Sequence, residues 1–354
     1  MADLVYKVED RSILLPYYKR LVVDPLLPFI PAKVSPNAIT HVGHLLNLLG
    51  TAVLLYMHPP SNAWGSGAPA GAPVTAHTAW PYFFAALLVN LYTWCDNADG
   101  AHARRTKQCS PLGEFLDHGL DQFNTVYIAY LTALSIGASP MAWVAITLLI
   151  PGGAVATFWE QSNTGVFRVG LLNQIEAVLA LTFALVMTGI FGPTFWDRTV
   201  VANIVLRDVM VIWPCATLLF GMARNLVRVT AQCGVKATWP ILVYLGFCAA
   251  IFGGIVVGAL TTLLAVALAS ALNIHLGMRM LARRLKKEPP QVEPFVLGGG
   301  VAVGALVVLK LAEKPLAPNV VPVLVVLACA ALGVQVILDA RTGVTMLSRV
   351  DQAA

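Results

Sequence analysis

The run ATWPILVYLGFCAAIFGGIVVGALTTLLAVALASALNIHLGM, from Ala237 to Met278, contains no charged residue. Its 42 residues are twice the roughly 20 that an α-helix needs to cross a bilayer. The glycines Gly253, Gly254 and Gly258 favour a turn between two spans. Because backbone polar groups in lipid must pair within the protein, each span must be helical. The run therefore predicts an all-α, multi-pass membrane protein.

The rest of the chain has the same character. Of its 354 residues, 58% are hydrophobic and 12% are charged, whereas soluble domains carry about 25% charged residues. Apolar segments recur along the chain, which predicts a polytopic protein with about ten transmembrane helices. The ten expected spans lie at residues 39–57, 80–96, 117–136, 140–158, 171–191, 207–224, 238–256, 258–277, 294–311 and 318–339.

The lysines and arginines support this span count, because cytosolic loops carry more of them than external loops. With a cytosolic N-terminus, ten spans place 19 of these residues inside and four outside. The four outside are Arg198, Arg207, Lys310 and Lys314. An odd number of spans would break the alternation. The pattern predicts that both termini are cytosolic.

The segments between the spans give further expectations. The first 35 residues lack a cleavable signal peptide. Apolar side chains from Leu14 to Val22 alternate with Lys19 and Arg20, which is typical of an interfacial amphipathic helix; a loosely ordered tail is the alternative. Residues 59–79 predict a flexible external loop, and residues 279–287 predict a basic cytosolic loop facing lipid phosphates. The six scattered cysteines suggest neither disulfides nor a zinc site.

The segment that indicates chemistry is CDNADGAHARRTKQCSPLGEFLDHGLDQ, from Cys95 to Gln122. Helical spacing gathers its polar residues on two faces. One face carries Asp96, Asp99, Gly100, Ala103 and Arg104, and the other carries Gly113, Asp117 and Asp121. Ser110 and Pro111 are typical of an N-cap and a first helical residue. Two helices joined by a short turn would point four carboxylates at each other.

Four carboxylates in one small pocket need cations, because like charges repel strongly where the dielectric constant is low. Ligation by aspartates alone favours Mg²⁺, Mn²⁺ or Ca²⁺ over zinc. Two ions would suit displacement at phosphorus. The glycines would let a pyrophosphate approach the backbone, and Arg104 would neutralise phosphate oxygens. Charges that merely solvate a helix end are the alternative interpretation.

The same segment fits the pattern D-x2-D-G-x2-A-R-x8-G-x3-D-x3-D at every fixed position. The chain thus resembles the CDP-alcohol phosphotransferase family. The resemblance implies that Asp96, Asp99, Asp117 and Asp121 bind two metal ions, Mg²⁺ or Mn²⁺. It also implies that CDP binds at Asp99, Gly100, Ala103, Arg104 and Gly113. SPNAIT resembles the segment before the family's first core helix, which adds Pro36, Asn37 and Thr40 to the nucleotide pocket.

Two further matches indicate the choline/ethanolamine phosphotransferase branch. In RRT-x3-SPLGE-x2-DHG, His118 follows the third aspartate, and FWEQSNTGVFRVGLLNQIEA resembles the branch's W-E-x3-T-G-x4-G-x5-E segment. The resemblance covers residues 12–180. Glu160, Glu176 and Trp159 are candidates for the cationic head group, since intramembrane carboxylates are costly; an ion pair between Glu160 and Arg168 is the alternative.

The residues leave the general base open between two candidates. Asp121 is the family-wide choice, but a carboxylate that binds a metal is a weak base. His118 is of a type that titrates near neutral pH, and Glu114, one helical turn earlier, would orient it. We favour His118. Three other histidines are expected to have no direct role: His41 and His44 as packing residues, and His102 as a bystander.

These observations together predict an enzyme that transfers phosphocholine or phosphoethanolamine from a CDP-alcohol to diacylglycerol, releasing CMP. We expect a cytosolic interfacial segment (1–35), a catalytic core (36–225), and further transmembrane helices with a cytosolic C-terminus (226–354). The membrane would be endoplasmic reticulum or Golgi in a eukaryote and the inner membrane in a bacterium. No nucleic-acid partner is expected, and a homodimer is compatible with the sequence. Inositol, glycerol phosphate or a sphingolipid acceptor are alternative substrates.

An ion-coupled transporter is the alternative class, because buried acids also mark ion pathways. Transporters usually place such groups near the midplane between repeated halves. Here the acids cluster at one membrane face, and the second half of the chain does not repeat them.

Overall fold

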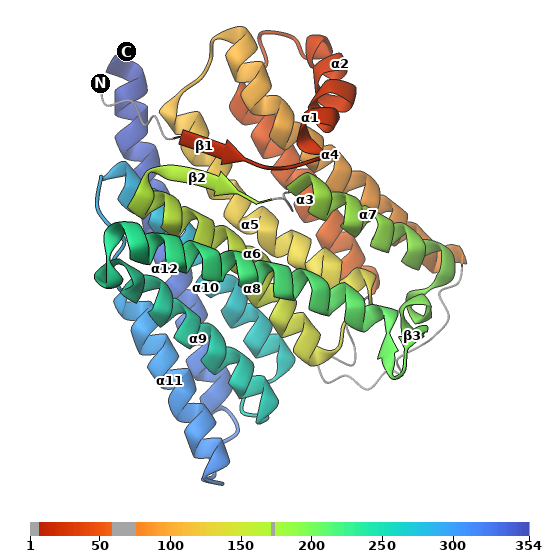
Figure 1. Cartoon of the computed structure of the whole chain (residues 1–354), viewed down its shortest axis with the longest axis vertical. Helices are drawn as coiled ribbons and strands as arrows, with labels where there is room; N and C mark the ends of the chain where they lie inside the picture. The colour runs from red at the N-terminus through yellow and green to blue at the C-terminus, as the bar shows by residue number, and fades with distance from the viewer. Residues whose placement is uncertain (1–6, 59–75, 171–173, 354) are drawn as a thin grey trace.

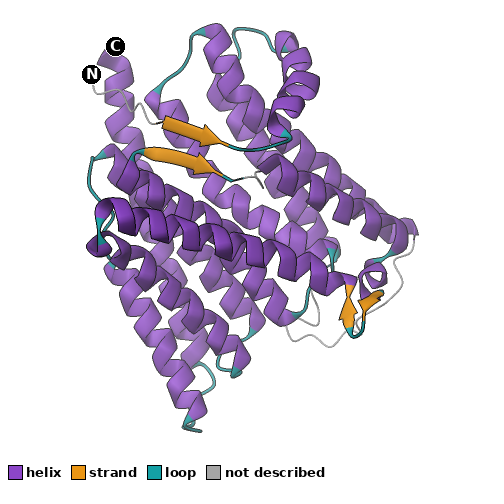
Figure 2. Ribbon diagram, viewed as in Figure 1, coloured by secondary structure: helices purple, strands orange, loops and turns teal. Residues whose placement is uncertain are grey.

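A computed structural model of the chain describes residues 7–58, 76–170 and 174–353. Ten long helices dominate the described part, and each expected span falls on one of them (Figures 1 and 2). They are α3 (Pro36–Met57), α4 (Ala76–Thr106), α5 (Pro111–Ser135), α6 (Pro140–Thr164), α7 (Gln174–Phe191), α8 (Leu206–Cys233), α9 (Trp239–Val256), α10 (Thr262–Leu285), α11 (Pro294–Leu311) and α12 (Val320–Ala353).

Within the described residues, eight helices are long and apolar enough to cross a membrane. The other two long helices, α4 and α5, carry the charged segment that links them and are therefore less apolar. The prediction of an all-α polytopic membrane protein is confirmed. The expected loop at residues 59–79 lies outside the described part up to residue 75.

Serine and proline start the two helices that flank the charged segment. Ser110 accepts a hydrogen bond from the Gly113 amide at 3.0 Å, and Pro111 opens α5, as the sequence predicts. Ser35 caps α3 in the same way, accepting from the Ala38 amide at 3.2 Å. These caps satisfy backbone donors that the helix itself leaves unpaired, so both helices begin at fixed points.

Helix α3 packs against both α4 and α5. A Cβ added to Gly43 would lie 2.8 Å from the Cβ of Cys95, so only glycine permits this close approach to α4. Towards α5, His44 Nδ1 lies 3.3 Å from Asn124 Oδ1, and Asn47 also contacts Asn124. His44 is thus a hydrogen-bonded packing residue, as expected. Helix α3 thus joins α4 and α5, the two helices that carry the charged segment.

The remaining helices extend this unit. α7 packs on α4, and α6 lies between α5 and the helices α8 and α10. α12 packs on α10 and α5, while α9 and α11 pack on each other at the far side from α7 (Figure 1). The second half of the chain thus touches the first chiefly through α8 and α10 against α6, and through α10 and α12 against α5.

The N-terminal region combines an expected helix with an unexpected strand. Residues from Leu15 to Phe29 are helical, in the order α1 (Leu15–Tyr18), a π-helical turn, α2 (Asp24–Leu26) and a 3₁₀ turn. Before them, β1 (Lys7–Asp10) pairs in parallel with β2 (Val166–Val169), which follows α6 (Figure 2). Local periodicity gives no sign of this pairing because the two strands lie far apart in the sequence.

The expectation of a basic loop from Arg279 was wrong for most of its length. α10 continues to Leu285, so the arginines are helical. Arg279 pairs with Asp339 at 2.7 Å, and Arg283 pairs with Glu293 at 2.9 Å. Both acids are almost fully buried, and buried carboxylates need such partners. These ion pairs hold the end of α10 to α11 and α12 rather than to lipid phosphates.

The topology is testable with single cysteines. Cys109 is exposed between α4 and α5, and Asn203 is exposed in the turn between β3 (Thr199–Val201) and β4 (Ile204–Val205). In a cysteine-free background, we expect restored Cys109 to react with an impermeant maleimide from the cytosolic side and Asn203→Cys to react from the other side. Labelling of both from one side would contradict the ten-span arrangement.

Candidate metal and substrate site

Three of the four predicted metal ligands converge. Asp96 near the C-terminal end of α4 meets Asp117 and Asp121 in the first half of α5, and one carboxylate oxygen from each lies within 4.8 Å of the others. All three side chains are half-buried. The regular spacing in the sequence thus produces a compact group of carboxylates, which we call the aspartate cluster.

Neighbouring polar groups hold part of this cluster in place. Asp121 Oδ1 accepts a hydrogen bond from Tyr92 Oη at 3.2 Å and a longer one from Asn124 Nδ2 at 3.4 Å. Gln174, at the start of α7, donates to the Tyr92 hydroxyl at 3.1 Å. Three helices therefore fix the direction of the Asp121 carboxylate.

The aspartate cluster fits a divalent cation. Among the described residues, Asp117 Oδ1 is buried without a hydrogen-bond partner, which is costly for a carboxylate oxygen unless a cation compensates it. Exclusively carboxylate oxygens suit hard ions such as Mg²⁺ or Mn²⁺. Asp96, Asp117 and Asp121 are therefore the residues that would hold the ion.

The fourth predicted ligand, Asp99, lies one helical turn beyond Asp96 and outside the group of three. It is only 4% exposed. Its Oδ2 accepts a 2.6 Å hydrogen bond from Thr40 Oγ1, and its Oδ1 accepts from the Gly100 amide at 2.5 Å. Thr40 thus contacts Asp99 and orients a carboxylate at the edge of the cluster. A role of Thr40 in the nucleotide pocket stays a prediction.

The residues predicted to bind CDP gather at the ends of α3, α4 and α5. A Cβ on Gly113 would lie 3.1 Å from Asn37 Oδ1, and one on Gly100 would lie 3.5 Å from Arg104 Nη1. Ala103 is buried beside them. Glycine at these two positions keeps the helix backbones close to an amide and a guanidinium group, and a guanidinium group suits phosphate oxygens.

The N-terminal helical segment reaches the same region. Tyr18 is half-buried, and this burial, followed by the charges of Asp96 and Cys95, raises the pKa of its hydroxyl to about 12. Glu176 Oε1 fixes the start of the segment, accepting from Ser12 Oγ at 2.8 Å and from the backbone amides of Ile13 and Leu14 at 3.0 Å.

His102 also holds this region, which agrees with its expected lack of a direct chemical role. The ring is buried, with Nε2 at 2.9 Å from the Val34 carbonyl and Nδ1 at 2.9 Å from Arg105 Nη2. Arg105 in turn donates to the Ile30 carbonyl at 2.6 Å. These contacts tie the chain before α3 to α4.

The three head-group candidates are all engaged in contacts within the protein. Glu160 is fully buried, and its two oxygens bind Arg168 at 2.8 Å and Arg228 at 2.6 and 2.8 Å. This geometry favours the alternative interpretation of a structural ion pair. Trp159 is buried and donates to the Ala237 carbonyl at 3.3 Å. Glu176, as described above, fixes the N-terminal helical segment.

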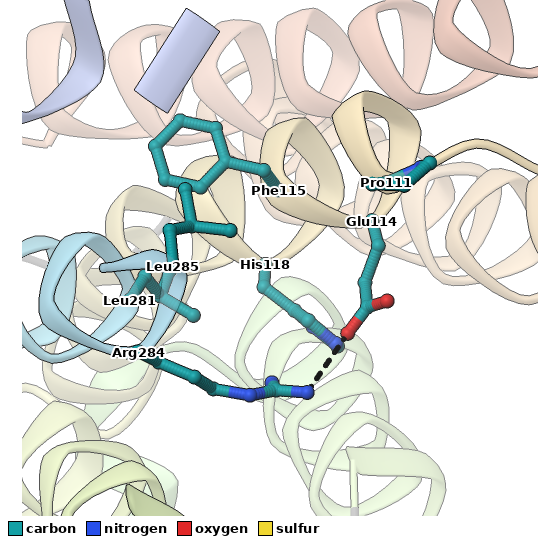
Figure 3. A pocket seen from close by; sticks show the side chains of 7 residues that line it. All are labelled: Pro111, Glu114, Phe115, His118, Leu281, Arg284 and Leu285. Carbon is teal, nitrogen blue, oxygen red and sulfur yellow. Dashed lines mark hydrogen bonds and ion pairs between the residues drawn. The ribbon is translucent and has the colours of Figure 1, made fainter. Parts of the chain in front are cut away.

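The two candidates for the base lie on different faces of α5. Asp121 belongs to the aspartate cluster, whereas His118 and Glu114 line a separate pocket between α5 and α10 (Figure 3). We call it the α5–α10 pocket; its other lining residues are Pro111, Phe115, Leu281, Arg284 and Leu285. The His118 ring meets Phe158 edge to face at 5.6 Å between centroids, and Arg284 Nη2 reaches Glu114 Oε1 at 3.3 Å.

Several of these site residues escaped the sequence analysis. Tyr92 lies one helical turn before Asp96, so helical spacing could have identified it. Gln174, Tyr18 and Arg284 come from segments distant in the sequence, and no local pattern connects them to the aspartates.

Comparison with known proteins identifies the surrounding domain. Residues 33–196 match the CDP-alcohol phosphatidyltransferase family. Cholinephosphotransferase 1 of Mus musculus is 32% identical over 202 residues, which cover 56% of this chain and 48% of the mouse protein. Choline/ethanolaminephosphotransferase 1 of Saccharomyces cerevisiae is 27% identical over 224 residues, 62% of this chain and 53% of the yeast protein. The chain spans about half the length of the curated relatives it matches.

The matched region begins just before α3 and ends after α7, so it contains the aspartate cluster, the Thr40–Asp99 contact and His118. It excludes the N-terminal helical segment and all helices from α8 onward. Residues 33–196 thus form a domain of the CDP-alcohol phosphatidyltransferase family, and the chain is similar over this part to cholinephosphotransferases and a choline/ethanolaminephosphotransferase.

Proposed function

We propose that this protein transfers phosphocholine or phosphoethanolamine from the CDP-alcohol to diacylglycerol. The observation that carries the proposal is the aspartate cluster, Asp96, Asp117 and Asp121, set within a domain of this family. The printed names of the mouse and yeast relatives support the choline and ethanolamine substrates.

The reaction joins the acceptor hydroxyl oxygen to the β-phosphorus of the CDP-alcohol. The bond from that phosphorus to the oxygen of CMP breaks, CMP leaves with the electron pair, and the hydroxyl proton passes to a base. Two bound Mg²⁺ or Mn²⁺ ions would neutralise phosphate oxygens as charge shifts onto CMP. Asp99, fixed by Thr40, stands beside the cluster. Arg104 would bind the pyrophosphate, and the glycines Gly100 and Gly113 would let it approach α4 and α5 closely.

His118 is the proposed base. Asp121 is committed to the cluster by its contacts with Tyr92 and Asn124, and a metal-bound carboxylate is a weak base. His118 lies one turn earlier on the neighbouring face, beside Glu114 and facing apolar side chains of α10. A lipid hydroxyl could approach there without displacing the cluster's ligands.

The membrane setting agrees with these substrates. The charge pattern assigns the α4–α5 link to the cytosolic side, where a water-soluble CDP-alcohol arrives, and diacylglycerol would enter from the bilayer. We propose an endoplasmic reticulum or Golgi location in a eukaryotic cell. CMP release on mixing the purified protein with CDP-alcohol and diacylglycerol tests the proposed reaction directly.

The metal assignment predicts loss of activity without loss of fold. Asp96→Asn, Asp99→Asn and Asp117→Asn should each reduce CMP release to background, because each removes a charged group at the site. The unfolding temperature of the metal-free protein should stay equal or rise, since repulsion within the site falls. Near-normal turnover with Mg²⁺ in any of the three would contradict the shared-metal assignment.

The base assignment predicts a different response. His118→Ala and His118→Gln should lower turnover by roughly two or more orders of magnitude, while the affinity for the CDP-alcohol, measured by calorimetry, should persist because His118 is outside the CDP-binding group. Thr132→Ala, on α5 well beyond the site, should leave turnover unchanged. Substantial turnover in both His118 variants would return the role to Asp121.

The ion pairs of Glu160 predict a structural effect. Glu160→Gln should lower the unfolding temperature in detergent, because breaking a buried pair typically costs about 3–5 kcal/mol. The ratio of CDP-choline to CDP-ethanolamine turnover should not change in the protein that remains folded. A changed ratio at unaltered stability would instead support Glu160 as a head-group residue.

A further inference from the structure

Arg284 is the one charged residue among the α10 side chains that line the α5–α10 pocket. Leu281, Arg284 and Leu285 occur at i, i+3 and i+4 and thus form one face of α10. In Figure 3 the guanidinium of Arg284 extends to the carboxylate of Glu114, in the pocket that the His118 ring also lines. α10 lies outside residues 33–196, the part that matches the family domain.

The other two arginines at this end of α10 point elsewhere. Arg279 and Arg283, one helical turn apart, both pair with Glu293, at 3.2 and 2.9 Å, and Arg279 also pairs with Asp339. Glu293 and Asp339 are nearly fully buried. This network fixes the end of α10 against α11 and α12. Arg284 is therefore presented to α5 from a rigid support.

The Arg284–Glu114 pair differs in character from these buried pairs. The Arg284 side chain is 15% exposed and the Glu114 side chain 33% exposed, with 3.3 Å between the paired atoms. A partly exposed pair of this length contributes little to stability. It does connect the Glu114 carboxylate to α10 at the edge of the α5–α10 pocket.

We propose that Arg284 is a positioning residue of the active site, holding the Glu114 carboxylate beside His118. The inference rests on the proposed function, in which His118 takes the proton of the acceptor hydroxyl and Glu114 orients it. It extends that function by assigning a part of the site to the second half of the chain. α10 then borders the part of the site where the acceptor hydroxyl meets His118, while α4 and α5 carry the aspartate cluster.

The kinetic test compares Arg284→Ala, Arg284→Lys and Glu114→Gln with Lys286→Ala as the matched control, since Lys286 is exposed two residues further along. Arg284→Ala should lower kcat about tenfold, because misplacing a catalytic group weakens proton transfer. The KM for the CDP-alcohol should change less than about twofold, since that substrate binds on the metal side. Arg284→Lys should restore most of kcat, and Lys286→Ala should equal the wild type.

A double variant tests whether Arg284 acts through Glu114 or affects turnover independently of it. Because both single changes break one contact, Arg284→Ala combined with Glu114→Gln should lower kcat no further than the more damaging single change. Unfolding temperatures of all variants should lie close to that of the wild type. Losses that multiply, or a kcat loss that tracks a fall in unfolding temperature, would overturn the proposal.

A second readout needs no turnover and so distinguishes failure of this inference from failure of the proposed function. Diethyl pyrocarbonate modifies accessible imidazoles, and mass spectrometry reports the rate at His118. Arg284→Ala and Glu114→Gln should both raise this rate by about threefold or more, because an ordered pocket restricts access. Glu114→Gln keeps the side chain's size, so space alone cannot explain its effect. Unchanged rates in both would overturn the positioning role even if the enzyme proves active.

Discussion

The mutual repulsion of the aspartates is the constraint around which this structure is organised. Two unit charges about 4 Å apart near a protein surface repel by about 4 kcal/mol, and three such carboxylates form three pairs. The sum approaches the whole net stability of a typical domain, roughly 5–15 kcal/mol. The aspartate cluster, whose oxygens lie within 4.8 Å of one another, therefore requires cations or protons. A fold that keeps these three carboxylates together therefore indicates a site where positive charge binds.

The surrounding helices provide hydrogen bonds to some of the carboxylates at the site but not to all of them. Asp121 and Asp99 each receive hydrogen bonds, from Tyr92 and from Thr40, whereas Asp117 Oδ1 has none among the described residues. The close contact of α3 with α4 at Gly43 makes the Thr40 contact reachable. The protein thus fixes the directions of two carboxylates and leaves a third oxygen for an ion. Such fixed groups cost no reorganisation when a phosphate arrives.

What the sequence could predict follows from the range of the interactions involved. The spans, the Ser110–Pro111 helix start and the convergence of Asp96, Asp117 and Asp121 depend on local periodicity and spacing, and the structure has each of them. The β1–β2 pairing and the ion pairs of Arg279 and Arg283 depend on segments that meet only in three dimensions. Glu160 illustrates the difficulty: its motif position suggested a ligand, but Arg168, the nearby alternative partner, and Arg228, which is distant in the sequence, both bind it.

Helices α10 and α12, in the second half of the chain, pack so closely on α5 that they help to set its position. A Cβ on Gly277 of α10 would overlap the side-chain amide of Gln122, and one on Gly343 of α12 would overlap the ring of Phe115. Both partners are on α5, on either side of His118 in the sequence. Glycine at these two positions lets α10 and α12 press against the helix that carries the site. Because packed interiors transmit small displacements, the orientation of α5 relative to α4 depends on helices outside the matched domain. The catalytic aspartates of the first half are therefore held by both halves.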